Sequence, residues 1–219
     1  MTAPNASADR LDALLLDYHA AGAFVAELSS SVVRIAVEPR KDPLVTIVGD
    51  PARLGTAVAI AGPAGPVLVA SGALAQDAQS IDVRTPSGRW IRCSGGVLLG
   101  DGALRRLDCT DPWLWVELKP LPLSQKTAGL SVPVFTVAGQ GTAHPSLHRG
   151  LIAEVLPRPL HGVVIVDLAA PWGAPMLSAD GHVLAVSFRP HPKDRRLSMA
   201  VTAETLSAWL RSEGPPQHP

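Results

Sequence analysis

The chain has 219 residues, which suits one large domain or two small ones at about 150 residues per domain. Hydrophobic residues make up 47% and charged residues 17%, a composition that excludes a chain disordered over most of its length. The 19 basic and 19 acidic residues cancel, so no net field attracts a nucleic acid or an anionic membrane, and we expect neither as a partner.

The first expected element is a helix over residues 8–28. Leu11, Leu14 and Leu15 follow a helical spacing after a polar segment that can cap the helix. We therefore predict an N-terminal helical segment over residues 1–28. The chain shows no basic and apolar leader and no apolar run of about 18 residues, so we expect no secretory signal and no spanning helix.

Short apolar runs separated by turn residues come next, which is typical of an all-β architecture. Asp180-Gly181 is a strong hairpin turn, because glycine adopts a positive φ without a Cβ clash. The proline-rich segment 119–125 divides the runs into two groups of similar size. We predict strands at Val32–Val37, Leu44–Val48, Thr56–Ala61, Pro66–Ala70, Ser80–Thr85, Arg89–Leu98, Leu104–Cys109, Leu114–Leu118, Ser131–Ala138, Gly150–Val155, Gly162–Asp167, Pro175–Leu177, His182–Phe188 and Leu197–Val201.

A short helix is expected over 202–210, with Thr202 as its N-cap and Gly214 as its stop. The predicted organisation is a first β-barrel over 29–118, a linker over 119–125, a second β-barrel with the C-terminal helix over 126–211, and a flexible tail over 212–219.

Several local sequences follow one another in an order that suggests a known family. They are Ser29-Ser-Ser-Val-Val-Arg-Ile35, Gly55-Thr-Ala-Val-Ala-Ile60, Gly65-Pro-Val-Leu-Val-Ala-Ser-Gly-Ala-Leu74, Ile81-Asp-Val-Arg-Thr-Pro-Ser-Gly-Arg89, Thr110-Asp-Pro-Trp-Leu-Trp-Val116, Pro171-Trp-Gly-Ala-Pro-Met-Leu177, Gly181-His-Val-Leu-Ala-Val186 and Ser198-Met-Ala-Val-Thr202. Together they resemble the HtrA-type members of the trypsin-like, chymotrypsin-fold serine proteases. The resemblance implies an all-β fold of two six-stranded antiparallel barrels, with an N-terminal helix and a short C-terminal helix.

The resemblance also locates the catalytic positions. In that family a histidine deprotonates the nucleophilic serine, and an aspartate orients the histidine. Here Gly72 falls at the histidine position and Trp172 at the serine position, while Asp111 matches the aspartate. Because no Ser, Thr or Cys occurs from 167 to 177, a shifted alignment supplies no nucleophile. We therefore predict a catalytically inactive pseudoprotease, which is not an enzyme.

A binding function is the expectation that remains. The family's cleft takes extended peptides against a sheet edge, and that mode does not need the triad. We predict a protein or peptide partner and a regulatory or adaptor role in a bacterial setting. Trp113 and Trp115 would share one face of the predicted strand, and tryptophan is enriched at interface hot spots. The predicted cleft residues are Ser71, Asp111, Trp113, Trp172 and Gly173.

Two alternatives stay open beside the adaptor. One is an active serine-type hydrolase with a non-standard site, which a Ser, Cys or Thr within hydrogen-bond reach of a His would mark. The other is an inert structural β domain within a larger assembly. The basic run 191–196 is expected as a solvated loop, with capture of an acidic partner segment as its alternative.

No cofactor or metal is expected. His144 and His148 have the i, i+4 spacing of a helical zinc site, but Pro145 argues against a helix there and no acidic ligand is near. Cys93 and Cys109 are too few for a four-cysteine site, and we expect both as reduced core residues of a cytoplasmic protein, although one disulfide is possible.

Overall fold

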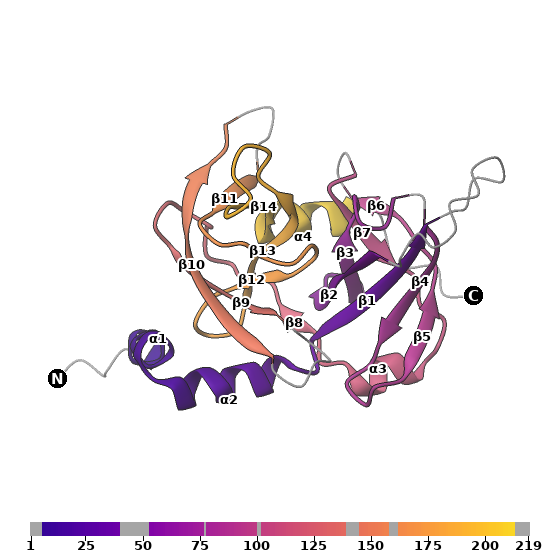
Figure 1. Cartoon of the computed structure of the whole chain (residues 1–219), viewed down its shortest axis with the longest axis horizontal. Helices are drawn as coiled ribbons and strands as arrows, with labels where there is room; N and C mark the ends of the chain where they lie inside the picture. The colour runs from indigo at the N-terminus through magenta and orange to yellow at the C-terminus, as the bar shows by residue number, and fades with distance from the viewer. Residues whose placement is uncertain are drawn as a thin grey trace.

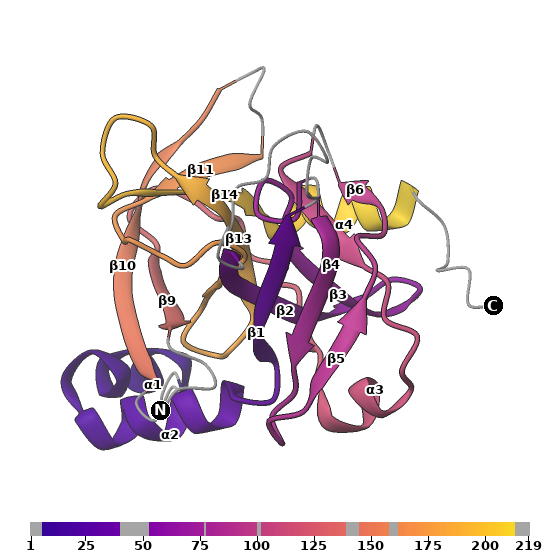
Figure 2. The ribbon, with the colours of Figure 1, turned by 45° about the vertical axis from the view of Figure 1, so that its right-hand side comes forward.

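The computed structural model describes residues 6–39, 53–76, 78–99, 102–138, 145–157 and 162–212 (Figure 1). Two β units lie side by side. Helices α1 and α2 lie beneath the second unit, and α4 lies behind the two (Figures 1 and 2). No helix in these described ranges is long and apolar enough to cross a membrane.

The first unit is an eight-stranded sheet. Seven strands follow the order β5-β4-β1-β2-β3-β7-β6, and the eighth, β8, pairs with β2 outside this order. Antiparallel pairing of β1 with β2 runs from Val32 opposite Val58 to Val37 opposite Arg53. The strands are β1 (Val32–Pro39), β2 (Arg53–Gly62), β3 (Gly65–Ser71), β4 (Ala78–Arg84), β5 (Trp90–Cys93), β6 (Leu98–Leu99), β7 (Leu104–Leu107) and β8 (Leu121–Pro122).

The two edges of this sheet approach each other where the chain leaves β5 and β7. An isolated bridge pairs Ser94 with Asp108, and the two residues exchange backbone N–H···O hydrogen bonds of 2.9 and 3.2 Å. A disulfide joins Cys93 and Cys109 directly beside the bridge. In the described residues the first unit has eight strands instead of the expected six, and the Ser94–Asp108 bridge is the pairing that joins its two edges. The expectation of reduced cysteines is also wrong.

The second unit is a closed barrel of six strands in the order β10-β11-β14-β13-β12-β9, as the sequence predicts. Alternate residues such as Val134, Ile152 and Met176 fill its interior, because successive side chains of a strand face opposite ways. The strands are β9 (Pro133–Ala138), β10 (Ser146–Val155), β11 (Val163–Val166), β12 (Pro175–Leu177), β13 (Val183–Pro190) and β14 (Ser198–Thr202).

The predicted linker hydrogen-bonds to both units. Strand β8 pairs in parallel with β2, and Leu123 bridges to Val183 of β13. The Ser124 N–H donates to the Val183 carbonyl at 2.8 Å. The segment between the units is therefore fixed to each of them by backbone hydrogen bonds.

The N-terminal helical segment consists of two helices, α1 (Ala6–Leu16) and α2 (Tyr18–Leu28), and the single helix predicted over 8–28 is corrected. Asp17 has an extended backbone (φ −108°), and its carboxylate accepts from the His19 N–H at 2.8 Å. This N-cap ends one helix and starts the next. Phe24 of α2 packs edge-on against Phe135 of β9, with ring centroids 6.1 Å apart.

Other segments differ from the prediction in identifiable ways. Residues Trp113–Glu117 form a short helix, α3, where a strand over 114–118 was predicted. The strand predicted over 89–98 divides into β5 and β6, with Gly96 between them at φ +29°. The C-terminal helix is present as α4 (Ala203–Ser212), while the strand predicted over 44–48 and the tail after residue 212 lie outside the described residues.

Loss of the disulfide is expected to destabilise the first unit. The bond closes a loop of 16 residues, and loops of this size correspond to about 3 kcal/mol of unfolding free energy. Reduction, or the double variant Cys93→Ala/Cys109→Ala, should lower stability by about that amount in urea unfolding followed by tryptophan fluorescence. The reductant should not affect the double variant. Two titratable thiols in the unreduced protein would contradict the prediction.

Candidate functional site

Three of the predicted cleft residues meet at a backbone junction between the two units. The Trp172 carbonyl accepts from the Thr56 N–H of β2 at 2.9 Å, and the Gly173 N–H donates to the Ser187 carbonyl of β13 at 2.9 Å. Gly173 has φ +83°, and a Cβ there would lie 3.1 Å from the Ser71 nitrogen and well inside contact distance of the Thr56 carbonyl oxygen. Ser71, Trp172 and Gly173 are thus brought together, in a junction too tight for a larger residue at 173.

The hydroxyl at this junction is not available as a nucleophile. Ser71 is completely buried, and its Oγ donates to the Phe188 carbonyl at 2.7 Å while it accepts from the Leu74 N–H at 3.3 Å. The Trp172 side chain is half-buried and packs against the core of the first unit. Ser71 therefore tethers β3 to β13 and has no described imidazole beside it to activate it.

Gly72, the position predicted for the catalytic histidine, is closed by backbone. Its N–H donates to the Ala103 carbonyl at 2.9 Å, and a Cβ would overlap the carbonyl group of Gly102. An imidazole at this position would require the Gly102–Ala103 turn to move.

The hydrogen bonds of Asp111 are made to Arg89 and to the start of helix α3. Its Oδ2 accepts from Arg89 at 3.1 Å, and its Oδ1 accepts from the Trp113 N–H at 2.9 Å at the start of α3. Among the described residues it makes no hydrogen bond to Ser71 or Trp172. The structure therefore gives Asp111 the turn role that aspartate often has, just before helix α3.

Trp113 lies beside Asp111 on an exposed corner. Leu114 of α3 is completely buried, whereas the side chains of Trp113 and Val116 are 60% and 72% exposed. Trp90 of the neighbouring strand β5 is 50% exposed. We call Trp90, Trp113 and Val116 the tryptophan corner. The prediction that Trp113 and Trp115 share a strand face is wrong, because a helix turns them to different sides and Trp115 packs against the core.

Two contacts hold the tryptophan corner in place. The Arg89–Asp111 ion pair joins the β4–β5 hairpin to the start of α3. At the other end of α3, Glu117 accepts from the Ser87 N–H at 3.0 Å. Hydrogen bonds from Ser87 hold the pKa of the Glu117 carboxyl below its usual range. The hairpin and the helix are therefore fixed to each other at both ends.

One hydroxyl–imidazole pair was not predicted from the sequence. Ser146 Oγ lies 2.9 Å from His148 Nε2 on β10, with Ser146 exposed and His148 half-buried. His148 is directly opposite Thr136 of β9, whose buried hydroxyl has no hydrogen-bond partner in the described part of the chain. The signal in the sequence is the i, i+2 spacing, which places two strand residues on one face.

The remaining candidates give no site. No three His, Cys, Asp or Glu side chains in the described ranges come together as metal ligands, and His144 lies outside those ranges. In the basic run, Arg196 pairs with Asp194 at 2.9 Å. Hydrogen bonds from Arg196 lower the pKa of Asp194 to about 2. Part of the run's positive charge is thus already neutralised within its own loop.

The tight backbone packing around Gly72 predicts that one added methyl group lowers the stability of the protein. Gly72→Ala forces that methyl into the Gly102 carbonyl and should lower the free energy of unfolding by about 1–3 kcal/mol, the usual result of overpacking. Gly22→Ala in α2 is the matched control, since a Cβ there meets nothing within 4 Å. Gly22→Ala should stabilise by about 0.5–1 kcal/mol in the same urea titration. Equal effects of the two variants would contradict this account of Gly72.

Comparison with known proteins gives structural matches only. No family model matches the chain, and neither does any curated protein sequence. The Rv3671c protease from M. tuberculosis in its active form matches with a TM-score of 0.69 and 18% identity, over 89% of this chain and 85% of that one. The serine endoprotease from Yersinia pestis matches at TM-score 0.64 and 14% identity, over 87% of this chain and 65% of that one. The HtrA-type protease AlgW, solved with a tripeptide, matches at TM-score 0.63 and 14% identity, over 87% and 62%.

These matches correct one prediction and support another. Each structure named above is a protease, a finding that goes against the prediction that the chain is not an enzyme. The resemblance to the HtrA-type proteases is confirmed at the level of the fold. With identities of 14–18%, the relation is distant. This chain has the fold of the trypsin-like serine proteases.

Proposed function

We propose that this chain is a protein- or peptide-binding domain on a trypsin-like scaffold, and that the tryptophan corner is its contact surface. The observation that carries the proposal is the exposure of Trp90, Trp113 and Val116, between 50% and 72%, beside a completely buried Leu114. Tryptophan is enriched among the residues that dominate binding energy at protein interfaces. Helix α3 therefore presents large apolar side chains to solvent while its other side anchors it.

The rigidity of the corner favours binding. The Arg89–Asp111 and Ser87–Glu117 contacts hold the hairpin and α3 together before any partner arrives. Contact residues that are already ordered lose little conformational entropy on association. More of the free energy gained by burying apolar surface is therefore available for binding. A regulatory or adaptor role suits a contact surface that is already ordered in this way.

The five residues predicted for one cleft support this proposal unequally. Ser71, Trp172 and Gly173 serve the junction between the two units, where the Ser71 hydroxyl and the Gly173 N–H are engaged within the fold. Asp111 and Trp113 belong to the corner. We therefore propose the corner, and not the junction, as the partner's contact.

The disulfide bears on where the chain works. Disulfides persist in oxidising compartments and are rare in reducing cytoplasm. The cytoplasmic prediction was made together with the expectation of reduced cysteines, whereas Cys93 and Cys109 are bonded. We propose an oxidising compartment in its place, and the thiol titration described above tests the disulfide on which this proposal rests.

A second candidate function is a serine-type hydrolase with a non-standard site. The observation that favours it is the 2.9 Å contact between Ser146 Oγ and His148 Nε2, together with the proteases that share the fold. An imidazole at this distance can accept the hydroxyl proton as the oxygen attacks a carbonyl. Since Ser146 is exposed, a substrate can reach its oxygen.

Substitution of Trp113 tests the binding function. The full-length protein is used to capture partners from its own cells, and captured proteins are quantified by mass spectrometry. Trp113→Ala should reduce recovery of a specific partner at least about tenfold, because truncating a hot-spot tryptophan commonly costs 2 kcal/mol or more. Leu130→Ala is the control, since Leu130 is 66% exposed and is not part of the corner. Equal recovery by wild type and Trp113→Ala would exclude the corner.

Labelling of Ser146 tests the hydrolase. A fluorophosphonate probe reacts with a serine that a neighbouring base activates, and peptide mapping locates the adduct. The adduct should form on Ser146 and should be lost in both Ser146→Ala and His148→Gln. Ser207→Ala is the control, because that hydroxyl contacts Arg211 and no histidine. Absence of labelling, or labelling of Ser146 that persists in His148→Gln, would contradict this candidate.

A further inference from the structure

The outer face of the first unit carries two arginines on neighbouring strands. Arg34 of β1 lies directly opposite Arg84 of β4, and Arg84 lies directly opposite Trp90 of β5. The residues that alternate with them are buried in the core of this unit, and they are Ile35, Val83 and Ile91. Since successive side chains of a strand face opposite ways, Arg34, Arg84 and Trp90 share the outer face. Figure 2 shows β1, β4 and β5 side by side, with α3 below β5.

Large apolar side chains lie on both sides of the two arginines. Leu54 of β2 is opposite Ala36, which follows Arg34 on the same outer face of β1. Leu54 is 55% exposed, and Trp90 on the other side is 50% exposed. We call Leu54, Arg34, Arg84 and Trp90 the arginine surface. Because Trp90 also belongs to the tryptophan corner, the two surfaces are continuous.

The Arg34 guanidinium has no carboxylate bound to it. Asp82 is its diagonal neighbour on β4, but Asp82 pairs with Arg92 at 3.1 Å. Asp111 pairs with Arg89, also at 3.1 Å. Arg34 is half-buried and forms no ion pair with another residue in the described part of the chain. The positive charge of Arg34 is therefore available to a ligand.

The position of Arg34 opposite Arg84 is expected to cost stability in the free protein. Like charges directly opposite each other on neighbouring strands are destabilising. No described contact of the Arg34 guanidinium offsets this repulsion, and an anion bound between the two arginines would remove it. Sequences depart from such local rules mainly at functional sites, so a binding role accounts for an arginine here.

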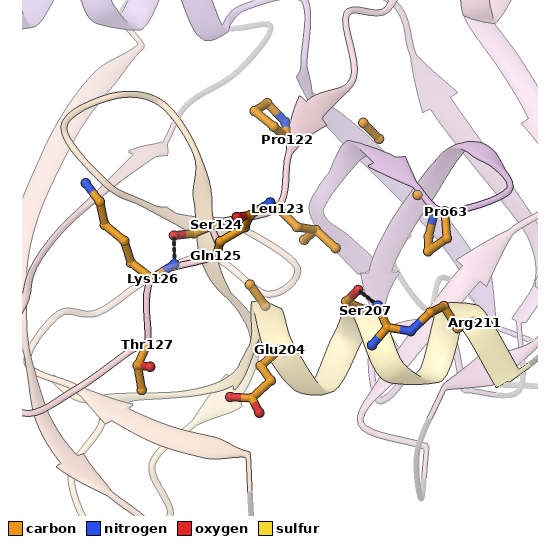
Figure 3. A pocket seen from close by; sticks show the side chains of 13 residues that line it. Pro63, Pro122, Leu123, Ser124, Gln125, Lys126, Thr127, Glu204, Ser207 and Arg211 are labelled. Atoms are coloured by element: carbon orange, nitrogen blue, oxygen red, sulfur yellow. Dashed lines mark hydrogen bonds between the residues drawn. The ribbon is translucent and has the colours of Figure 1, made fainter.

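A hollow of about 480 Å³ between the linker and α4 also contains cationic side chains, but it suits an anion less well (Figure 3). Lys126 pairs there with Asp180 at 3.3 Å, and Arg211 donates to the Ser207 hydroxyl at 2.9 Å. Glu204 lines the same hollow and would repel a second acidic group. The arginine surface is therefore the better site for an acidic ligand.

We propose that the polypeptide segment bound at the tryptophan corner extends across the arginine surface and places an acidic side chain between Arg34 and Arg84. This partner chemistry rests on the binding function proposed above. The segment carries an aspartate or glutamate with large apolar residues before and after it, which pack on Leu54 and Trp90. A polypeptide is favoured over a nucleic acid, because the chain has no net positive charge to attract a polyanion.

A library of random twelve-residue peptides displayed on phage supplies the probes, and the full-length protein is the target. The enriched peptides should carry Asp or Glu flanked by large apolar residues. A synthetic peptide of the enriched sequence is then titrated calorimetrically into wild type, Trp113→Ala and Arg34→Gln. Its binding should be lost in Trp113→Ala, and its affinity for wild type should fall with added salt.

A double-mutant cycle assigns the carboxylate to Arg34. Arg34→Gln should weaken binding about two- to fivefold, the range of exposed ion pairs. Replacing the peptide's acidic residue by its amide should weaken binding to wild type by a similar factor and have no further effect in Arg34→Gln. Arg149→Gln is the control, because Arg149 is an exposed arginine of β10 in the other unit. In urea unfolding, Arg34→Gln should be at least as stable as wild type, because the repulsion from Arg84 is removed.

The possible failures are distinguishable. Enriched peptides without acidic residues, or an acidic peptide that binds wild type and Arg34→Gln equally, would overturn the acidic contact and leave the tryptophan corner in place. Binding that is weakened in Arg34→Gln but unchanged in Trp113→Ala would support the acidic contact and exclude the corner. Selection of no peptide would overturn both. A twelve-nucleotide oligothymidylate that binds wild type but not Arg34→Gln would assign the surface to a nucleic acid and overturn the proposal.

Discussion

The apolar face that the two β units share is the constraint on which the rest of the structure depends. Val58 and Ile60 of β2 contribute to the same core cluster as Val137, Val186 and other residues of the second unit. Helices α2 and α4 add their buried residues to this cluster as well. One face of β2 packs against the second unit and the other face packs in the core of the first unit. The register of β2 is strongly fixed, because a shift by one residue would exchange the two faces. The linker, pinned to β2 and β13, follows from that packing.

This packing leaves little freedom at the junction between the units. Thr56 and Trp172 are joined through backbone, and Gly55 and Gly173 have no space for a Cβ. Side-chain chemistry is therefore easiest to vary away from the junction, on elements whose inner face alone is fixed. Helices α3 and α4 are of this kind, since Leu114 and Leu206 are completely buried while the opposite faces are open to solvent.

The sequence predicts the strands well because their alternation and their turns are local signals. The six strands of the second unit and the C-terminal helix follow from such signals, whereas the closure of that unit into a barrel was implied by the resemblance to the HtrA-type proteases. The errors come from side chains that act on neighbouring backbone. Asp17 caps α2 and divides one predicted helix, and Asp111 starts α3 where apolar alternation suggested a strand. The disulfide requires the two edges of a sheet to meet, and spacing along the chain does not reveal that. Of the residues predicted for one cleft, Trp113 lies on helix α3, which the apolar alternation of its segment did not predict.

Many charged side chains of this electrically neutral chain form ion pairs with one another. Arg10 binds Glu27, Arg92 binds Asp82, Lys126 binds Asp180 and Arg196 binds Asp194, so most described pairs tie one element or loop to another or close a turn. Exposed pairs of this kind contribute little stability, and their main effect is to reduce the unpaired charge on the surface. Against such a surface a few unpaired groups stand out. The partner proposed for the tryptophan corner would therefore depend on local apolar groups of α3, because the chain has no net charge to attract it.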